Sequence, residues 1–385
     1  MRNSSVIVSP PESGGVRGGL NNCSYTRVQP PSNSPLLRGR TGYSAIVILF
    51  LFLTITSVSA QSLTFVELNC ENLFDYHDDE GKDDSEYLPE ATRHWTKKRY
   101  WRKLNNIAQE LLSCSDETIP DLIALCEVEN DSVLTDLSKR SLLRNAGYEY
   151  LMTSSPDLRG IDVALLYSPF SFAPVRSYPI RVTPIEGMRP TRDILYVSGL
   201  IASPPESGAS HLVSPPESGG VRGGLNDTLH IFVIHFPSRY GGSRYSHPFR
   251  QAAVDRLCQS IDSIRAFSPD ANLLIAGDFN DGPDSDILQQ LSQHGLHNLT
   301  QNALGDHDVR GTYRYQGEWE RIDHILASPH IYNKVEKAVI HSPKFLLESE
   351  KLYGGFRPRR TYNGMRYQPA YSDHLPLVVK ICLNR

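Results

Sequence analysis

Side chains that can hold a metal ion or move a proton recur along the sequence from residue 69 onward. They are Asn69, Glu71, Glu127, His235, Asp278, Asn280, Asp323, Asp373 and His374. Carboxylate and amide oxygens suit a hard divalent ion such as Mg²⁺ or Mn²⁺, and an imidazole exchanges protons near neutral pH. Together these residue types indicate metal-assisted hydrolysis if the fold brings them together.

Apolar runs of strand length accompany these residues. The expected strands are 63–69, 121–126, 163–167, 229–235, 272–277, 322–327 and 375–381. The polar residues are expected at the C-terminal ends of the strands. Because the ends of neighbouring strands surround a single mouth, residues distant in sequence should form one site there.

Amphipathic runs of helical period alternate with the expected strands. The expected helices cover about 95–112, 133–145, 248–266 and 286–294. Several strands are nearly continuous apolar stretches, as sheets covered on an inner face require. The alternation predicts an α/β domain with helices outside packed sheets.

A set of short segments, in chain order, resembles the signature segments of the endonuclease/exonuclease/phosphatase superfamily. They are LNCENL, ALCEVEN, VIHFPSR, AGDFND, RIDHIL and YSDHLP. That family includes pancreatic-type deoxyribonucleases, exonuclease III-like repair endonucleases, neutral sphingomyelinases and inositol polyphosphate 5-phosphatases. The resemblance spans residues 64–383. We therefore expect one four-layer α/β sandwich, with two mixed β-sheets packed face to face and helices outside.

The resemblance implies which residues hold the metal ion. Glu127 looks like the principal ligand, and Asn69 and Glu71 would complete or position the ion. Asp373 looks like a second carboxylate on the metal side. The implied cofactor is Mg²⁺ or Mn²⁺.

The resemblance also implies catalytic roles. Asp278 and Asn280 look like the pair that orients the attacking water and holds the phosphate. His374 resembles the histidine that contacts the scissile phosphate, held in one tautomer by Asp323. His235 is similar to the histidine that acts as general acid or phosphate ligand in the deoxyribonuclease and sphingomyelinase branches. A carboxylate can take the proton of water and a histidine can protonate the leaving oxygen, so the implied reaction is in-line hydrolysis.

Each of these residues also has an ordinary structural explanation when it is taken singly. Glu127 could be a solvated residue at the end of a strand, and Glu129 beside it is expected to be only that. Asp323 could cap a helix or a turn, and Asn280 in FNDGP could shape a turn, since Asn, Asp, Gly and Pro favour turns. Their joint occurrence in the order of the family favours the catalytic interpretation.

The segment PSRYGGSRYSHPFR places three arginines after the expected strand 229–235. Arg239 is a candidate substrate contact, because a guanidinium matches the geometry of a phosphate. The alternative for Arg239, and the expectation for Arg244 and Arg250, is a solvated loop followed by a helix start. The acidic partner that the deoxyribonuclease branch gives its first histidine has one candidate here, Asp162.

Aromatic residues that could stack on bases or sugars, or could simply pack, follow later in the chain. They are Tyr313, Tyr315, Trp319, Tyr362 and Tyr367.

Composition excludes several classes of protein. Hydrophobic residues make up 39% and charged residues 21% of the sequence, which is typical of a globular protein and not of a disordered or multi-span membrane protein. The formal net charge is -4. Because the chain lacks a global basic surplus, any affinity for nucleic acid must be local.

The N-terminal region is expected to leave the mature protein. Residues 1–44 are rich in Ser, Pro, Gly and Asn and are predicted to be disordered. Residues 45–60, AIVILFLFLTITSVSA, are predicted to be a signal peptide, with the mature chain starting near Gln61. An uncleaved membrane anchor is the alternative, although it would need roughly 18 or more apolar residues. We expect a secreted or periplasmic protein without stable membrane insertion after cleavage.

A low-complexity tract, VSPPESGGVRGGLN, occurs at residues 8–21 and again at 213–226, and a truncated copy begins at Ser203. The copies carry no apolar face and cannot build a core. The truncated and second copies are expected to form an insert, at about 203–226, in the loop between strand-like runs 194–202 and 228–235. A surface loop tolerates such an insert because loop-closure entropy grows slowly with length.

Six cysteines are present, and their spacings match neither a zinc site nor a dense disulfide scaffold. Cys70 and Cys126 lie within apolar runs and are expected to be small buried hydrophobes.

These observations predict that residues 61–385 form an exported, metal-dependent phosphoester hydrolase. An endonuclease or phosphodiesterase is the preferred activity, and the expected partner is a phosphoester substrate, with nucleic acid as a candidate. The alternatives are a sphingomyelinase-like enzyme, an inositol-phosphate phosphatase, or a non-catalytic binding module on the same scaffold. We expect a monomer.

Overall fold

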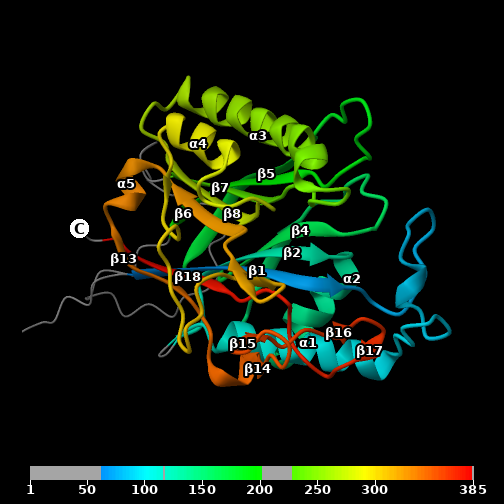
Figure 1. Ribbon diagram of the computed structural model, residues 1–385. Helices are drawn as coiled ribbons and strands as arrows, with labels where there is room; N and C mark the ends of the chain where they lie inside the picture. The colour runs from blue at the N-terminus through cyan, green and yellow to red at the C-terminus, as the bar shows by residue number, and fades with distance from the viewer. Residues whose placement is uncertain (1–61, 116–117, 202–227, 384–385) are drawn as a thin grey trace, which may run out of the picture. The chain divides into compact units, whose positions relative to one another are not determined.

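A computed structural model of the chain describes residues 62–115, 118–201 and 228–383, all of which belong to one structural unit (Figure 1). The predicted disordered region, the predicted signal peptide and all copies of the repeat lie outside the described residues. No helix in the described part of the chain is long and apolar enough to cross a membrane.

Two six-stranded mixed sheets form the centre of the unit. The strands of the first sheet, in spatial order, are β13 (Val335–Ile340), β18 (Leu377–Cys382), β1 (Ser62–Leu73), β2 (Leu122–Val128), β4 (Asp162–Tyr167) and β3 (Glu149–Met152). The strands of the second sheet are β5 (Phe172–Ile180), β6 (Ile194–Ile201), β7 (Thr228–His235), β8 (Asn272–Asp278), β12 (Asp323–Ala327) and β9 (His297–Asn298). All seven predicted strands are confirmed.

Successive apolar side chains of the strands point alternately to the two faces of each sheet, and they form three apolar layers. On β1, Phe65 faces the core between the two sheets, whereas Val66 and Leu68 face α1 (Lys97–Leu112). Ile275 of β8 faces outward in the same way, toward α3 (Ser243–Arg265) and α4 (Asp286–Gln293). Successive strand residues point to opposite faces, so each sheet is buried on both sides. The predicted four-layer sandwich is confirmed, and Figure 1 shows α1 on one side and α3 with α4 on the other.

Small elements complete the unit. They are the helices α2 (Asp131–Thr135) and α5 (Pro329–Tyr332), and the two-stranded sheets β10 (Tyr313–Tyr315) with β11 (Glu318–Glu320), β14 (Leu347–Ser349) with β15 (Phe356–Pro358), and β16 (Tyr362–Asn363) with β17 (Arg366–Tyr367). β6 and β7 pair antiparallel, with Leu200 opposite Thr228. The two strands that flank the second repeat are therefore neighbours.

Two helix predictions need correction. The expected helix 133–145 is broken into α2, a π-helical turn at Asp136–Arg140 and a 3-10 turn at Leu142–Asn145. The hydroxyl groups of Ser138 and Ser141 donate to carbonyls four residues earlier, and such bonds weaken and bend a helix. α3 begins at Ser243, before the predicted start, and contains Pro248.

The cysteines of the described residues are buried and free, namely Cys70, Cys114, Cys126, Cys258 and Cys382. The expectation of buried, hydrophobe-like Cys70 and Cys126 is confirmed. The Cys126 thiol also donates to the carbonyl oxygen of Ile234, 3.1 Å away, which links β2 to β7 across the two sheets.

Candidate active site

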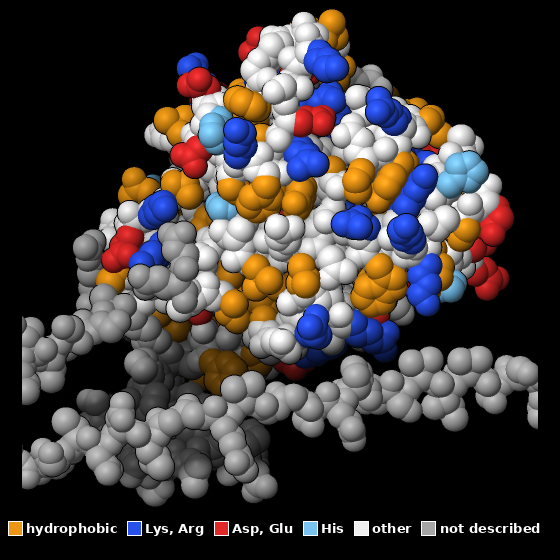
Figure 2. Space-filling view, turned by 90° about the horizontal axis from the view of Figure 1, so that it is seen from below, with side chains coloured by type: hydrophobic (Ala, Val, Ile, Leu, Met, Phe, Trp, Pro, Cys, Tyr) orange, Lys and Arg blue, Asp and Glu red, His pale blue; other side chains and the backbone are white. Residues whose placement is uncertain are grey.

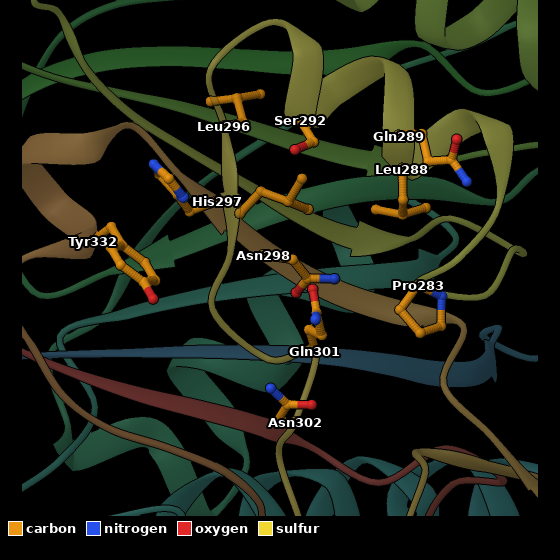
Figure 3. Close-up of a pocket in the computed structure, with 11 residues that line it drawn as sticks. Pro283, Leu288, Gln289, Ser292, Leu296, His297, Asn298, Gln301, Asn302 and Tyr332 are labelled. Atoms are coloured by element: carbon orange, nitrogen blue, oxygen red, sulfur yellow. The ribbon is translucent and has the colours of Figure 1, made fainter.

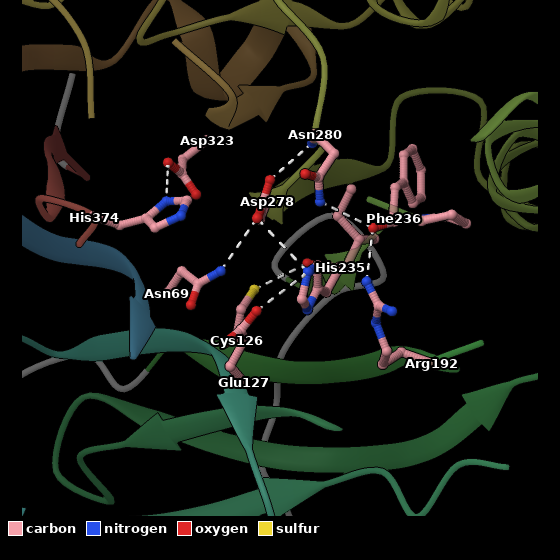
Figure 4. A network of polar contacts seen from close by, with 12 residues as sticks. Asn69, Cys126, Glu127, Arg192, His235, Phe236, Asp278, Asn280, Asp323 and His374 are labelled. Carbon is pink, nitrogen blue, oxygen red and sulfur yellow. Dashed lines mark hydrogen bonds and ion pairs between the residues drawn. The ribbon is translucent and has the colours of Figure 1, made fainter. Parts of the chain in front are cut away.

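The central strands of each sheet are parallel, so their C-terminal ends lie at the same edge. β1 pairs with β2, and β7 with β8, in parallel. Asn69 lies toward the end of β1, and His235 and Asp278 close β7 and β8 at paired positions. These side chains are directed toward one another in the space between the sheets (Figure 4).

Asp323, Asp373 and His374 reach the same edge from the opposite ends of their strands. Asp323 is the first residue of β12, which runs antiparallel to β8 and pairs Asp323 with Asp278. Asp373 and His374 precede β18, which runs antiparallel to β1. The prediction that every site residue follows a strand was wrong for these three. An antiparallel neighbour begins where the adjacent strand ends, so the same edge collects residues from both kinds of strand end.

A glycine allows the closest approach of two of these strands. Gly277 precedes Asp278 and has a φ of 144°. A Cβ atom at Gly277 would lie 1.9 Å from the carbonyl oxygen of Ile234 on β7. A side chain at this position would therefore displace Asp278 relative to His235.

Register shifts and left-handed backbone conformations orient several of the side chains in the site. The register of β1 against β2 shifts just after Asn69, and that of β2 against β4 shifts at Glu127. Glu71, Asn72, Glu127 and Asn280 have φ values of 51°, 54°, 61° and 51°, in the left-handed region that residues other than glycine rarely adopt. β-bulges redirect side chains, and strained residues cluster at functional sites.

His235 lies close to both Glu127 and Asp278 (Figure 4). The Nε2 atom of His235 is 3.6 Å from Oδ2 of Asp278 and 3.9 Å from Oε1 of Glu127. The side-chain amide of Asn69 donates to Oδ2 of Asp278 at 3.1 Å. The other oxygen of Glu127 accepts the backbone N–H of Asn72 at 2.8 Å. Four strands thus contribute polar groups to one place.

Asp278 links this group to Asp323 and His374. One ligand atom from each of these three residues lies within 4.8 Å of the others. The Oδ1 atom of Asp278 accepts the backbone N–H of Asn280 at 2.7 Å. Burial and the carboxylate of Asp323 raise the pKa of Asp278 to about 7. A carboxyl group that titrates near neutral pH is suited to accept a proton from water.

His374 is held by Asp323 in a fixed orientation. Its Nδ1 atom lies 2.8 Å from Oδ2 of Asp323, and both side chains are buried. Burial would lower the pKa of His374, but Asp323, Asp373 and Asp278 outweigh that effect and raise the pKa well above its usual value. His374 is therefore protonated near neutral pH, with Nε2 available as a second donor.

His235 differs from His374 in its charge. Burial, followed by the positive charges of Arg192 and Arg159, lowers the pKa of His235 well below its usual value. Its Nδ1 atom has no hydrogen-bond partner among the residues that the structure describes. Asp162 does not serve as its acidic partner, because that carboxylate accepts bonds from Thr153 and Ser155 instead. His235 is thus a neutral imidazole facing two carboxylates.

Glu71 and Asp373 form a second group beside the first. Arg360 bridges them, with a bond to Asp373 and its Nε atom 3.7 Å from Oε1 of Glu71. The other oxygen of Glu71 accepts the backbone N–H of Thr361 at 2.7 Å and lies 3.4 Å from the buried Nζ of Lys103. Burial and the charge of Asp373 raise the pKa of Glu71, against the effect of Lys103. Two cations therefore engage the carboxylates that were expected to face the metal.

Arg239 is tied to the site by two bonds. Its Nε atom donates to the carbonyl oxygen of Asn280 at 2.9 Å, and its Nη1 atom pairs with Glu320 at 2.8 Å. Arg244 is exposed, as expected. Arg250, expected at a solvated helix start, is fully buried and pairs with Asp281 at 2.9 Å, so it fixes the segment that follows Asp278.

A cavity of about 270 Å³ opens next to the second group. Its lining residues are Glu71, Asn72, Tyr87, Arg93, Trp95, Arg360, Thr361, Tyr362, Gly364 and Asp373. The guanidinium of Arg93 lies 5.2 Å from the ring centre of Tyr87 and 4.9 Å from that of Tyr362. Charged and aromatic groups thus share one hollow beside the candidate active site.

Another cavity, of about 320 Å³, lies between α4, β9 and α5 (Figure 3). Amide side chains of Gln289, Asn298, Gln301 and Asn302 line it, and the rings of His297 and Tyr332 stack beside it, 4.5 Å apart. No acidic residue lines this cavity. It is separate from the carboxylate-rich edge.

The aromatic candidates divide between packing and exposed positions. The ring of Tyr313 packs 5.0 Å from that of His374, and Trp319 lies under Arg314 at 5.1 Å. Tyr362 lines the cavity beside the site. Tyr315 is exposed, and Tyr367 lies under Arg99 at 4.3 Å. Tyr313 and Tyr362 are therefore the two of this set that border the candidate site.

Several residues that lie in or beside the candidate site were not predicted from the sequence. Lys103 is a buried cation on α1, where a basic side chain suggests a solvated face. Arg360 and Arg192 lie outside the expected elements. Glu67 sits on the inner face of β1, fully buried, and neither of its carboxyl oxygens has a hydrogen-bond partner among the described residues. Burial and Asp323 raise the pKa of Glu67 well above its usual value. The one available signal was an acidic residue inside an apolar run.

Solved structures share this arrangement of sheets. An endonuclease/exonuclease/phosphatase family protein from Bacteroides thetaiotaomicron is 16% identical, with a TM-score of 0.50 over 83% of this chain and 97% of that chain. A second, from Bacteroides vulgatus, is 13% identical, with a TM-score of 0.50 over 83% of this chain and 98% of that chain. At these identities the likeness shows the fold. No curated protein was found to match the chain.

The amino-acid sequence itself also matches a known protein family. The endonuclease/exonuclease/phosphatase family matches residues 64–205 and 219–383. The matched residues include every member of the candidate site, and the gap between them, residues 206–218, falls within the predicted insert at about 203–226. The chain therefore belongs to the endonuclease/exonuclease/phosphatase family, a family of phosphoester hydrolases that generally depend on a divalent metal ion.

Proposed function

We propose that the protein is an exported phosphodiesterase, dependent on Mg²⁺ or Mn²⁺, that acts on a nucleic acid or a similar phosphodiester. The observation that carries this proposal is the meeting of Glu127, Asp278 and His374, with Asn69 and His235, at one edge of two packed sheets. The predicted signal peptide motivates the proposed export.

The donor atoms at this edge fit a hard divalent ion. Glu127 directs Oε1 toward the centre of the site while its other oxygen is fixed by the backbone of Asn72. Asn69 and Asp278 supply amide and carboxylate oxygens, which such ions prefer. Glu127 and Asn69 would hold the ion, Asp278 would lie beside it as the proton acceptor, and Asp373 would add negative charge. Bound there, the ion would neutralise charge on the phosphate.

Asp278 and the histidines would perform the proton transfers and orient the phosphate. Asp278, with a pKa near neutrality, accepts a proton from the attacking water, and the N–H of Asn280 fixes one of its oxygens. His374, held protonated by Asp323, donates to a phosphate oxygen or to the leaving oxygen. His235 is neutral, so its role is a hydrogen bond to the phosphate. The oriented hydrogen-bond donors of His374 and His235 would thus stabilise the negative charge that develops on the phosphate.

The surroundings of the site favour an extended anionic substrate. Arg93 and Arg360 line the adjoining cavity together with Tyr87, Trp95 and Tyr362, a combination that suits phosphate and a base or sugar. Basic side chains gather on the face formed by α1 and its neighbouring hairpins (Figure 2). Exposed members of this group on α1 are Lys97, Lys98 and Arg102. The local positive field offsets the lack of a global basic surplus.

The test compares substrates after complete removal of metal with a chelator. We expect hydrolysis of bis-p-nitrophenyl phosphate and of plasmid DNA to return on adding Mg²⁺ or Mn²⁺, and to exceed hydrolysis of p-nitrophenyl phosphate by about tenfold or more. Faster cleavage of the monoester would redirect the assignment to a phosphatase, including one for inositol phosphates. Preferential hydrolysis of sphingomyelin vesicles would indicate a sphingomyelinase. The absence of metal-dependent hydrolysis of every substrate would favour a binding module.

A further inference from the structure

Four carboxylates gather in the loop that follows β1 and at the end of β2, outside the candidate active site. They belong to Asp75, Asp79, Asp84 and Glu129. Asp75, Asp84 and Glu129 are buried, with exposed fractions of 8%, 1% and 5%, and Asp79 is half-buried. Ligand atoms of Asp79, Asp84 and Glu129 lie within 4.8 Å of one another. The same edge of the first sheet thus carries a second acidic cluster.

Hydrogen bonds engage one oxygen each of Asp79, Asp84 and Glu129, whereas both oxygens of Asp75 accept bonds, Oδ1 from the backbone N–H of His77. Oδ2 of Asp84 accepts the backbone N–H of Asp79 at 3.0 Å, and Oε2 of Glu129 accepts that of Asp75 at 2.6 Å. The amide of Asn130 lies 3.4 Å from Oδ2 of both Asp75 and Asp79. The loop is thereby folded around its own acidic side chains.

No basic side chain neutralises the cluster within the described part of the chain. None of the four carboxylates forms an ion pair there. Lys82, which belongs to the same loop, directs its ammonium group to the carbonyl oxygens of Ser155 and Asp157. Oδ1 of the buried Asp84 has no hydrogen-bond partner among the described residues. An unpaired buried charge is costly, and burial raises the pKa of Glu129 to about 9. The cluster is therefore neutralised either by protons or by a cation from solution.

We propose that Asp75, Asp79, Asp84 and Glu129 form a second divalent-cation site, of the calcium type. Calcium accepts six to eight oxygen ligands in flexible geometry, which matches carboxylates from an irregular loop and a strand end. Mg²⁺ demands near-octahedral geometry and retains its waters, so it fits this set less well. The site does not depend on the proposed catalytic activity.

The cation would join the ends of two strands that carry catalytic candidates. Asp75 follows the segment in which Asn72 donates its N–H to Glu127. Glu129 is two residues beyond Glu127, just after the end of β2, and its backbone N–H donates to the carbonyl oxygen of Leu73. A cation shared by Asp75 and Glu129 would therefore hold Glu127 in place from outside the catalytic site.

The binding test uses the full chain with Glu127→Gln, which weakens the catalytic ion site. After chelation, calorimetric titration with Ca²⁺ should show one binding site. Adding Asp84→Asn should weaken that binding by about tenfold or more. Adding Asp83→Asn instead is the matched control, because Asp83 is the exposed neighbour and its substitution should leave the dissociation constant unchanged.

Thermal unfolding provides a second measurement of Ca²⁺ binding. It also shows whether each variant is folded. Ca²⁺ about 100-fold above its dissociation constant should raise the Tm by about 5 °C. Asp79→Asn should remove most of that increase, whereas the exposed neighbour Asp78→Asn should retain it. Absence of Ca²⁺ binding in Glu127→Gln, or equal binding and an equal increase in Tm in the Asp79 and Asp84 variants, would overturn the proposal.

Discussion

Replacing Glu127 with Gln is expected to lower kcat/KM for phosphodiester hydrolysis by about 1,000-fold or more. The substitution keeps the size of the side chain but removes the negative charge of the proposed principal metal ligand. The loss of a metal-bound transition state is worth several kcal/mol, and each 1.36 kcal/mol is about tenfold in rate. Raising the Mg²⁺ concentration should recover part of the rate, because the remaining oxygen donors still bind the ion weakly.

Glu90→Gln is a suitable control, since Glu90 is exposed and lies outside the candidate site. It should retain the activity and the Tm of the unsubstituted protein. Steady-state kinetics over a range of Mg²⁺ concentrations would measure both effects. Activity of Glu127→Gln within about threefold of the unsubstituted protein, at limiting Mg²⁺, would remove Glu127 from the metal site.

Replacing His374 with Gln is expected to lower kcat by about 100- to 10,000-fold, which is the range for loss of a catalytic proton transfer. Glutamine can donate a hydrogen bond but carries no positive charge. Substrate affinity should change less than kcat, because the imidazolium matters most when charge develops in the transition state. His330→Asn on the exposed side of α5 is the control.

The pH profile separates the chemical role of His374 from a structural one. Asp323 raises the pKa of His374, and activity that needs the imidazolium is lost as pH rises through that pKa. Asp323→Asn should therefore move the alkaline limb of the pH–rate profile to lower pH. An unchanged limb, or full activity of His374→Gln, would contradict the assigned role.

The strands were predictable because their signals are local. Runs such as Leu122–Val128 and Asn272–Asp278 are continuous apolar stretches that end in a carboxylate or its neighbour. Only a buried strand explains both the run and its polar end. The short edge strands β3 and β13 were not predicted, because half-exposed strands carry mixed sequences.

The residues that meet at this edge were named from the sequence, but their geometry was not predicted. Asp323 and His374 were expected at the ends of strands, but Asp323 begins β12 and His374 precedes β18, because the order of strands within a sheet is set by tertiary pairing. The engagement of Glu71 by Lys103 and Arg360 depends on contacts across more than 30 and 280 residues of sequence. No local pattern reveals such contacts.

The second acidic cluster could not be predicted from local sequence either. Asp78, Asp79, Asp83 and Asp84 look alike in the sequence DYHDDEGKDD. The structure buries Asp84, half-buries Asp79 and leaves Asp78 and Asp83 exposed. Glu129, expected to be solvated, is buried beside them. Burial thus distinguishes ligand candidates from surface charge where composition could not.

Anomalous diffraction from crystals soaked in Mn²⁺ would locate the proposed metal ion. We expect a peak within about 2.0–2.4 Å of a carboxylate oxygen of Glu127, with Asn69 or Asp278 among the nearest neighbours and His374 facing the same space. A peak bound by other residues alone, or none between the two sheet edges at saturating Mn²⁺, would contradict the assignment of this edge as a metal-dependent active site.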